Sequence, residues 1–136
     1  MDQAKMGEMS KIIVGYKMLE GSVGVVPLTL YEEPGAKAFV AKYHKQNAEK
    51  DPTTEVAYNY FALHTVVQAM QEAGTVEDAE AIRGAFSAAL KSLKPENNPY
   101  GVTAIDGKGG MMADPNIATV KNGEVVLQRM SEVLAE

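Results

Sequence analysis

The chain has 136 residues, 46% of them hydrophobic and 23% charged, which is the composition of a soluble globular protein with one core. Its formal net charge is −5 and its 13 lysines and arginines are scattered, which argues against a nucleic-acid surface because such a surface needs clustered cations. The sequence has no cysteine and no run of about 18 apolar residues, which excludes disulfides, thiolate metal sites, cysteine nucleophiles and a membrane-spanning helix.

The first 31 residues predict a short helix followed by an extended segment. "GSVGVVPLTLY", residues 21–31, is rich in strand-forming residues. Pro27 has no N–H to contribute to a sheet, so we expect an edge strand or a strand that passes into a linker. The helix is expected to end near Gly15, and the apolar residues that predict it are Met6, Met9 and Ile13.

A second helix is predicted from Pro34 to about Gln46. Proline suits the first position of a helix because the N–H that it lacks would be unpaired there anyway. Apolar residues then recur at i, i+3, i+4 and i+7, which places them on one face of the helix. They are Ala36, Phe39, Val40 and Tyr43.

The most regular pattern predicts two helices joined at Gly74, which supplies the left-handed residue that ends the first of them. Thr53 or Thr54 can cap the first helix, and Thr75 is expected to cap the second. The apolar stripe of the first helix consists of Val56, Tyr60, Leu63, Val67 and Met70. The buried face of the second is expected to consist of Ala79, Ile82, Phe86, Ala89 and Leu93.

The rest of the chain predicts loops and strands. "KPENNPYG" is a loop by composition, "YGVTAID" is a short strand and "GKGG" is a turn. "NIATVKNGEVVLQRM" predicts a hairpin around Asn122–Gly123, because this pair accepts positive φ at both centres of a type I′ turn. "SEVLAE" would add one helical turn. The order of helix, strand, three helices, strand and hairpin indicates an α/β fold with too few strands for a complete sheet.

Residues that could carry chemistry are few and separated. His44 and His64 lie on different predicted helices and have no ligand four residues away, so they form no helical metal pair. "GKGG" at 107–110 lacks the rest of a phosphate-binding loop. The acidic pairs at 32–33 and 77–78 suit helix N-termini, which favour negative charge. No serine lies in a G-x-S-x-G motif, and we predict no catalytic residue, metal or cofactor.

Three residues lie at the start of the longest predicted helix. Tyr60 is on the apolar stripe and is expected to be core, whereas Glu55 and Tyr58 are one turn apart and off the stripe. Such a helix mouth can present an aromatic wall and a charge to a small polar ligand. Ordinary capping and an exposed tyrosine would explain the same residues. The residues alone leave both interpretations open.

Four segments follow one another in a recognisable order. They are "GSVGVVPLTLYEEPGAKAFVAKYHKQN", "PTTEVAYNYFALHTVVQAMQEAGTVEDAEAIRGAF", "GVTAIDGKGG" and "IATVKNGEVV". The ordered set resembles the C-terminal third of type I periplasmic binding proteins, the branched-chain amino-acid (Leu/Ile/Val) receptors of ABC transporters. It spans about residues 20–127, with F-x-x-x-Y at Phe39 and Tyr43 and A-x-x-x-A-G ending at Gly74. The sequence departs from the family in lacking an aromatic residue before Asp106 and in the segment "MMADPN".

The resemblance implies a partial α/β fold of the type I periplasmic-binding-protein kind, in which two lobes are joined by crossing strands and close like a hinge. Within one partial domain, residues 1–136, it implies a hinge-crossing strand at 20–31 and lobe-one helices at 32–95. A strand and hairpin of lobe two would occupy 100–130. Most of the residues that contact the ligand in this family would lie in parts of a full-length receptor that this sequence does not contain.

The resemblance further implies a solute-binding component of an ABC transporter that binds a small polar ligand, such as a branched-chain amino acid, and is not an enzyme. Tyr58, and secondarily Glu55, would line the ligand cleft. The partner of the full-length protein would be an ABC permease, and its location would be periplasmic or extracellular. The polar N-terminus is not a secretion signal, so the signal peptide is expected outside this chain.

Three amphipathic helices without the rest of their sheet would expose large apolar faces. We therefore expect either a fragment or a homodimer formed by strand or helix exchange, and binding of branched-chain amino acids no tighter than millimolar by this chain alone. Two alternatives stay open. Attached domains would indicate a stand-alone ligand-sensing or protein-interaction module, and a partner chain with a catalytic cleft would indicate an enzyme subunit.

Overall fold

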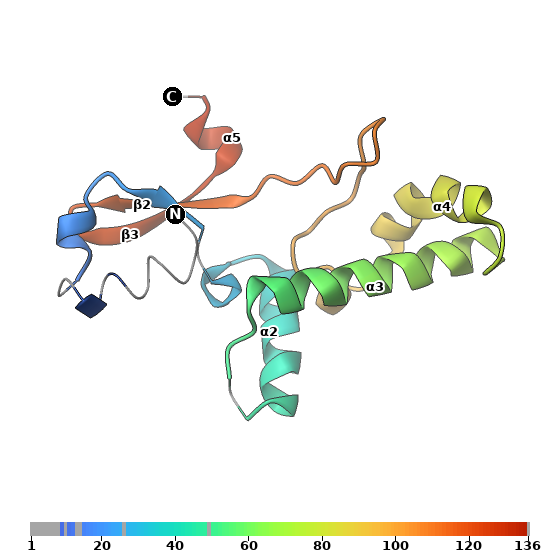
Figure 1. The fold of residues 1–136 in the computed structure, drawn as a ribbon, viewed down its shortest axis with the longest axis horizontal. Coiled ribbons are helices and arrows are strands. Elements are labelled where there is room, and N and C mark those ends of the chain that lie inside the picture. Colours follow the sequence, from blue (N-terminus) through green and yellow to red (C-terminus); the bar gives the residue numbers. More distant parts are fainter. Residues whose placement is uncertain (1–8, 10, 13–14, 26, 49, 136) are drawn as a thin grey trace. The chain divides into compact units, whose positions relative to one another are not determined.

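The computed structural model describes residues 9, 11–12, 15–25, 27–48 and 50–135. The described residues form two compact units, one drawn from the ranges 1–30 and 114–136 and the other from the range 31–113 (Figure 1). The predicted N-terminal helix depends on Met6 and Ile13, which lie outside the described residues. Among the described residues, no helix combines the length and apolar character needed to cross a membrane.

The first unit contains an antiparallel sheet with the order β1-β2-β3. β2, Asn116–Lys121, and β3, Glu124–Arg129, form the predicted hairpin, and β1, Val23–Gly24, pairs with β2 at the edge. Asn122 and Gly123 have φ of 56° and 77°, as a type I′ turn requires. The prediction of this turn from its two residues is confirmed.

Of the two expectations for residues 21–31, the structure matches a strand that passes into a linker. Only Val23–Gly24 is a strand, and Leu28–Leu30 forms the short 3₁₀ helix η2, while Tyr16–Leu19 forms η1 before it. Pro27 lies between the strand and η2, where its missing N–H cannot extend a ladder and its carbonyl instead accepts the N–H of Leu30 at 3.0 Å. The expectation of an edge strand holds for two residues.

Alternation along β2 buries one face of the hairpin. Asn116, Ala118 and Val120 are buried, whereas the residues between them are half-buried. After β3 the chain forms the short helix α5, Met130–Val133, which confirms the predicted helical turn. Asp114 fixes this end of the unit, because its carboxylate accepts hydrogen bonds from the Ser131 N–H at 2.9 Å and the Ser131 hydroxyl at 2.7 Å. These two bonds lower the pKa of Asp114.

The second unit contains three α-helices and the short 3₁₀ helix η3, Pro95–Asn97. The helices are α2, Pro34–Gln46, α3, Thr54–Ala73, and α4, Ala79–Ser92, and all three confirm the sequence prediction. α4 runs back alongside α3, and α2 packs against η3 (Figure 1). Gly35 makes this second contact possible, since a Cβ at that position would lie 2.4 Å from the Asn98 carbonyl oxygen.

Local chemistry sets the ends of α3. Thr53 is the N-cap, and its hydroxyl accepts the Val56 N–H at 3.4 Å. Gly74 ends the helix with φ 67°, in the left-handed conformation that glycine adopts without steric cost. Both features were predicted from the sequence.

The predicted cap of α4 is wrong by one turn. Thr75 caps the connecting turn, where its hydroxyl accepts the N–H groups of Glu77 at 3.1 Å and Asp78 at 3.2 Å. Asp78 is the N-cap of α4, and its carboxylate accepts the Ala81 N–H at 3.0 Å. The segment offers two capping residues in succession, and the helix begins after the second because the first is used by the turn.

The predicted apolar stripe of α3 does not form the core of this chain. The buried residues of α3 are Ala57, Phe61, Thr65 and Ala69, which lie on a neighbouring face. From the predicted stripe, Val56, Leu63 and Val67 are exposed, and Tyr60 and Met70 are half-buried. α4 packs on the face with small residues because two helix backbones approach closely there. Of the larger apolar face, Val56, Leu63 and Val67 stay exposed in the described part of the chain.

The predicted buried face of α4 is correct only at its C-terminal end. Ala89 is buried together with Leu90, whereas Ala79 is exposed. The other predicted residues, Ile82, Phe86 and Leu93, are half-buried. Leu90 joins Phe61 and Val102 in the core cluster of this unit, on which Leu93, Tyr100 and Ile105 pack.

The strand predicted for "YGVTAID" is not formed. One isolated bridge pairs Ile105 with Met111, and a strand needs partners along its length. The turn predicted for "GKGG" is confirmed, because the Asp106 N–H donates to the Gly110 carbonyl at 2.8 Å and the Gly109 N–H donates to the Asp106 carbonyl at 3.1 Å.

Candidate functional site

Both predicted ligand-binding residues lie at the start of α3 in the second unit. Thr53 orients this end of the helix, which places Glu55 in the first turn and Tyr58 in the next one. Glu55 is exposed, and its carboxylate is favoured there by the positive end of the helix dipole. The structure thus brings a negative charge and an aromatic ring together at a helix mouth.

Tyr58 stacks on Tyr100, with ring centroids 4.5 Å apart and an interplanar angle of 21°. On the core side, Tyr100 meets Phe61 edge to face, with centroids 6.1 Å apart. Such pairs hold both rings in one orientation. Tyr58 is 47% exposed, so it is the outer member of an aromatic group that is anchored in the core. An exposed aromatic surface held by a rigid base is suited to contact a ligand.

The loop before and after Tyr100 is fixed by a buried asparagine. The Asn98 side-chain amide donates to the Val102 carbonyl at 2.8 Å, and its oxygen accepts the Val102 N–H at 3.0 Å. Gly101 within this loop has φ 63°, which favours glycine. The Tyr100 hydroxyl donates to the Thr54 carbonyl at 3.2 Å, at the N-terminal end of α3. This bond ties the loop to the helix that carries Tyr58.

Burial and the neighbouring Tyr58, Tyr31 and Glu55 raise the pKa of Tyr100 above its ordinary value. The phenol of Tyr100 therefore stays protonated and neutral at physiological pH. Glu55 then supplies the negative charge at the helix mouth. A carboxylate beside exposed aromatic surface is a combination suited to a cation such as an ammonium group.

Tyr100 is a residue of the site that the sequence pattern does not predict, because "KPENNPYG" is a loop by composition. The signal was the residue type, because a large aromatic side chain between proline and glycine in a polar loop needs something to pack against. The identity of that partner could not be read from spacing. Tyr58 and Tyr100 belong to separate segments that meet only in the folded unit.

Tyr60 serves a different contact from Tyr58. It is half-buried rather than fully buried, and its ring packs on Phe39 of α2 at 5.1 Å and on His64 at 4.4 Å. The Tyr60 hydroxyl donates to the Asn97 side-chain oxygen at 2.8 Å and receives a hydrogen bond from Lys42. These contacts join α2, α3 and η3, which is a structural role.

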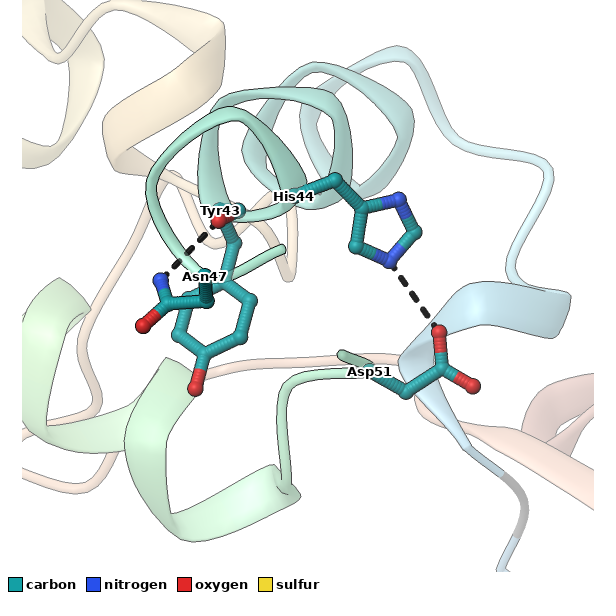
Figure 2. Close-up of polar contacts among 4 residues, drawn as sticks. All are labelled: Tyr43, His44, Asn47 and Asp51. Atoms are coloured by element: carbon teal, nitrogen blue, oxygen red, sulfur yellow. Dashed lines mark hydrogen bonds and ion pairs between the residues drawn. The ribbon is translucent and has the colours of Figure 1, made fainter. Parts of the chain in front are cut away.

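The two histidines have different neighbours, since His64 packs on Tyr60 and His44 contacts Asp51. His44 Nε2 lies 3.1 Å from Asp51 Oδ1, beside Asn47, which donates its amide to the Tyr43 carbonyl at 2.9 Å (Figure 2). This pair links the end of α2 to the segment that leads into α3. Across the described ranges, no group of three or more His, Asp or Glu side chains could hold a metal ion.

The acidic pairs have local roles. Glu32 forms an ion pair with Lys37, which lies in the first turns of α2. From the other pair, Asp78 caps α4. Among the hollows formed by the described residues of this unit, two have volumes of about 450 Å³ and 580 Å³, and neither is lined by Tyr58 or Glu55. The larger one is shallow and follows the end of α3, from Val67 to Glu77.

Comparisons with known proteins agree on one family. The sequence model described as "Periplasmic binding protein" matches residues 9–124. The crystal structure of a leucine binding protein, LivK, from Thermotoga maritima matches with a TM-score of 0.53 and 26% sequence identity. The match covers 86% of this chain and 32% of that protein, so this chain spans about a third of its length. No match is found among curated proteins. The predicted partial α/β fold is confirmed by this structural similarity.

Proposed function

This chain belongs to the periplasmic binding protein family, and on that premise we propose that it serves as the solute-binding part of an ABC transporter. The proposed ligand is a small polar molecule such as a branched-chain amino acid. Binding involves no chemical step, and the working location is the periplasm or the exterior of the cell. The name of the structural relative, a leucine binding protein, supports this ligand class.

The observation that carries the proposal is the anchored aromatic surface beside a carboxylate. Tyr58 would form a side wall of the ligand cleft, because its ring is held by Tyr100 and is still 47% exposed. Glu55 would attract the ammonium group of the ligand. This chain spans only a third of the related structure, so further contacts to the ligand would come from polypeptide outside this sequence. Binding by this chain alone would therefore be millimolar or weaker.

The lobe assignment is also a proposal. Residues 32–95 would be lobe-one helices, 20–31 a hinge crossing and 100–130 a part of lobe two. The division of the chain supports two crossings, because the chain passes from one unit to the other at residues 30–31 and 113–114. In this division the passage at 113–114 comes after the turn at 106–110, whereas the resemblance implies that lobe two begins near residue 100.

The proposed protein partners are an ABC permease and, for this chain by itself, a second copy that exchanges strands or helix faces. The exposed apolar stripe of α3 supports a protein partner, because a stripe of this kind is costly to leave in water. The same stripe favours the second candidate function, a stand-alone ligand-sensing or protein-interaction module. Light scattering at several concentrations measures the mass of the particle in solution. A monomeric mass at every concentration would exclude the homodimer.

The test of ligand binding is a titration of the ¹⁵N-labelled chain with leucine, isoleucine and valine, followed by the NMR signals of the tyrosine rings and backbone. We expect the Tyr58 and Tyr100 signals to shift at millimolar ligand. Tyr58→Ala should weaken this binding, and Tyr58→Phe should retain most of it because the ring surface is kept.

The charge contribution has a matched control on the same helix. Glu55→Gln should weaken binding at the helix mouth, whereas Glu72→Gln, at the other end of α3, should leave it unchanged. Tyrosine signals that remain still for all three amino acids, in a chain that is folded by circular dichroism, would contradict the proposed site.

A further inference from the structure

A hollow of about 450 Å³ lies between α4 and the turn at residues 105–109, within the second unit. We propose that this hollow is a second binding site, which takes a free amino acid with an apolar side chain. Its lining combines two acids, a base and an apolar floor, in a space of the size that small-molecule sites have. The lining residues used below are Glu80, Arg83, Gly84, Phe86, Ile105 and Asp106.

Two opposite charges on α4 line the hollow, and Asp106 lines it from the turn. Glu80 and Arg83 are three residues apart on α4, which places them on one side of the helix. Within the described ranges, neither forms a salt bridge or a side-chain hydrogen bond with the other or with a third residue. A free amino acid presents a matching pair of charges, because its ammonium can meet Glu80 while its carboxylate meets the guanidinium of Arg83.

The floor of the hollow is apolar and is attached to the core. Phe86 is half-buried, and Ile105 packs against the cluster formed by Phe61, Leu90 and Val102. An aliphatic side chain that covers Phe86 and Ile105 would remove apolar surface from water. Gly84 leaves room above this floor, since a Cβ at that position would meet no atom within 4 Å.

The far wall is preformed. The Asp106 carboxylate accepts the N–H groups of Lys108 at 2.8 Å and Gly110 at 2.7 Å, which closes the turn on itself. A Cβ at Gly110 would lie 2.9 Å from Asp106 Oδ2, so a side chain there would displace this carboxylate. Because the wall is fixed before a ligand arrives, binding need not order the loop.

The proposed site is independent of the proposed function, because it shares no lining residue with the helix mouth at Glu55 and Tyr58. The two can therefore fail separately in one titration. The reporters of the hollow are the backbone signals of Gly84, Ile105 and Gly107, and those of the helix mouth are Tyr58 and Tyr100.

The experiment titrates the ¹⁵N-labelled chain with leucine and with three blocked forms of it. N-acetyl-leucine lacks the ammonium, leucine amide lacks the carboxylate, and N-acetyl-leucine amide lacks both charges. Leucine should shift the reporters of the hollow. Each single block should weaken this effect about tenfold, since one charge-assisted contact is lost. Equal shifts with the doubly blocked form would overturn the proposal, because they would indicate contact with apolar surface only.

Variants complete the test. Arg83→Gln should remove the discrimination between leucine and leucine amide, and Glu80→Gln should remove that between leucine and N-acetyl-leucine. Lys91→Gln, on the exposed side of the same helix, is the matched control and should change neither. Tyr58→Ala should leave the reporters of the hollow unaffected. Two results would refute a second site. One is that the reporters of the hollow no longer shift in Tyr58→Ala, and the other is that leucine does not shift them in the unmodified chain.

Discussion

Tyr58 of α3 and Tyr100 of the loop after η3 stack with their ring centroids 4.5 Å apart, and the Tyr100 hydroxyl holds the first residue of the same helix. The contact does two things at once. It fixes the loop against the start of α3, and it keeps the Tyr58 ring in place while leaving much of it open to solvent. The candidate binding surface therefore depends on a residue that does not itself need to touch the ligand.

A double-mutant cycle should measure this coupling. We expect Tyr58→Ala and Tyr100→Ala to be non-additive by roughly 0.5–1.5 kcal/mol in the free energy of unfolding, the range for aromatic pairs. Urea unfolding followed by circular dichroism gives each value. Tyr100→Phe, which keeps the ring and loses the bond to the Thr54 carbonyl, should preserve most of the coupling. Additive effects would contradict the stacked arrangement.

Gly35 should tolerate no side chain. A Cβ in Gly35→Ala would lie 2.4 Å from the Asn98 carbonyl oxygen, so α2 and η3 must move apart, at a cost of about 1–3 kcal/mol. Gly84→Ala is the matched control, because its Cβ meets nothing within 4 Å and it lies inside α4. That variant should stabilise the unit by roughly 0.5–1 kcal/mol through helix propensity. Equal thermal midpoints for the two variants would disprove the close approach.

Asn98→Ala should destabilise the loop that carries Tyr100. The change leaves the N–H and carbonyl of Val102 without their buried partner, at a cost of about 1–3 kcal/mol. Hydrogen exchange at Val102 should accelerate, and the Tyr58 signals should broaden or shift because their support is loosened. Asn59→Ala, an exposed residue of α3, is the control and should change stability little. Unchanged exchange at Val102 would show that Asn98 does not hold the loop.

His64 should titrate below its ordinary pKa of 6.5, because burial, and then the charge of Lys42, disfavour its protonated form. Since protonation is easier in the unfolded chain, this contribution to stability is present above pH 6.5 and is lost as the pH falls through the folded-state pKa. NMR titration of the imidazole measures the pKa. Lys42→Met should raise it only partway towards its ordinary value, whereas Lys91→Met should not move it. A full return in Lys42→Met would mean that burial is not the larger cause.

The exposed stripe of α3 predicts an asymmetry between stability and association. Leu63→Ser should change the free energy of unfolding little because Leu63 is 63% exposed, while it should reduce hydrophobic-dye binding and any self-association. Phe61→Ala, two residues away and 1% exposed, should cost about 3–5 kcal/mol. Light scattering and urea unfolding separate the two effects. A large loss of stability in Leu63→Ser would place this stripe in the core.

Local chemistry was enough to predict the elements whose ends it controls. Pro34, Thr53 and Gly74 act on their own backbone or on the next turn, and Asn122–Gly123 sets a hairpin through its own φ angles. These effects involve residues that are neighbours in the chain, so the sequence contains all the information that they need. The pairing of Glu55 with Tyr58 at one helix mouth followed from helical spacing in the same way.

Tertiary structure decided what the helices meet. Periodicity indicated that Val56, Leu63 and Val67 form one face of α3, but burial went to the neighbouring face because α4 returns along its small residues. Tertiary contacts also decided that "YGVTAID" forms no strand and that Tyr58 stacks on Tyr100. Packing, strand pairing and ring stacking are contacts between residues distant in sequence, and only the folded chain determines which of them come together.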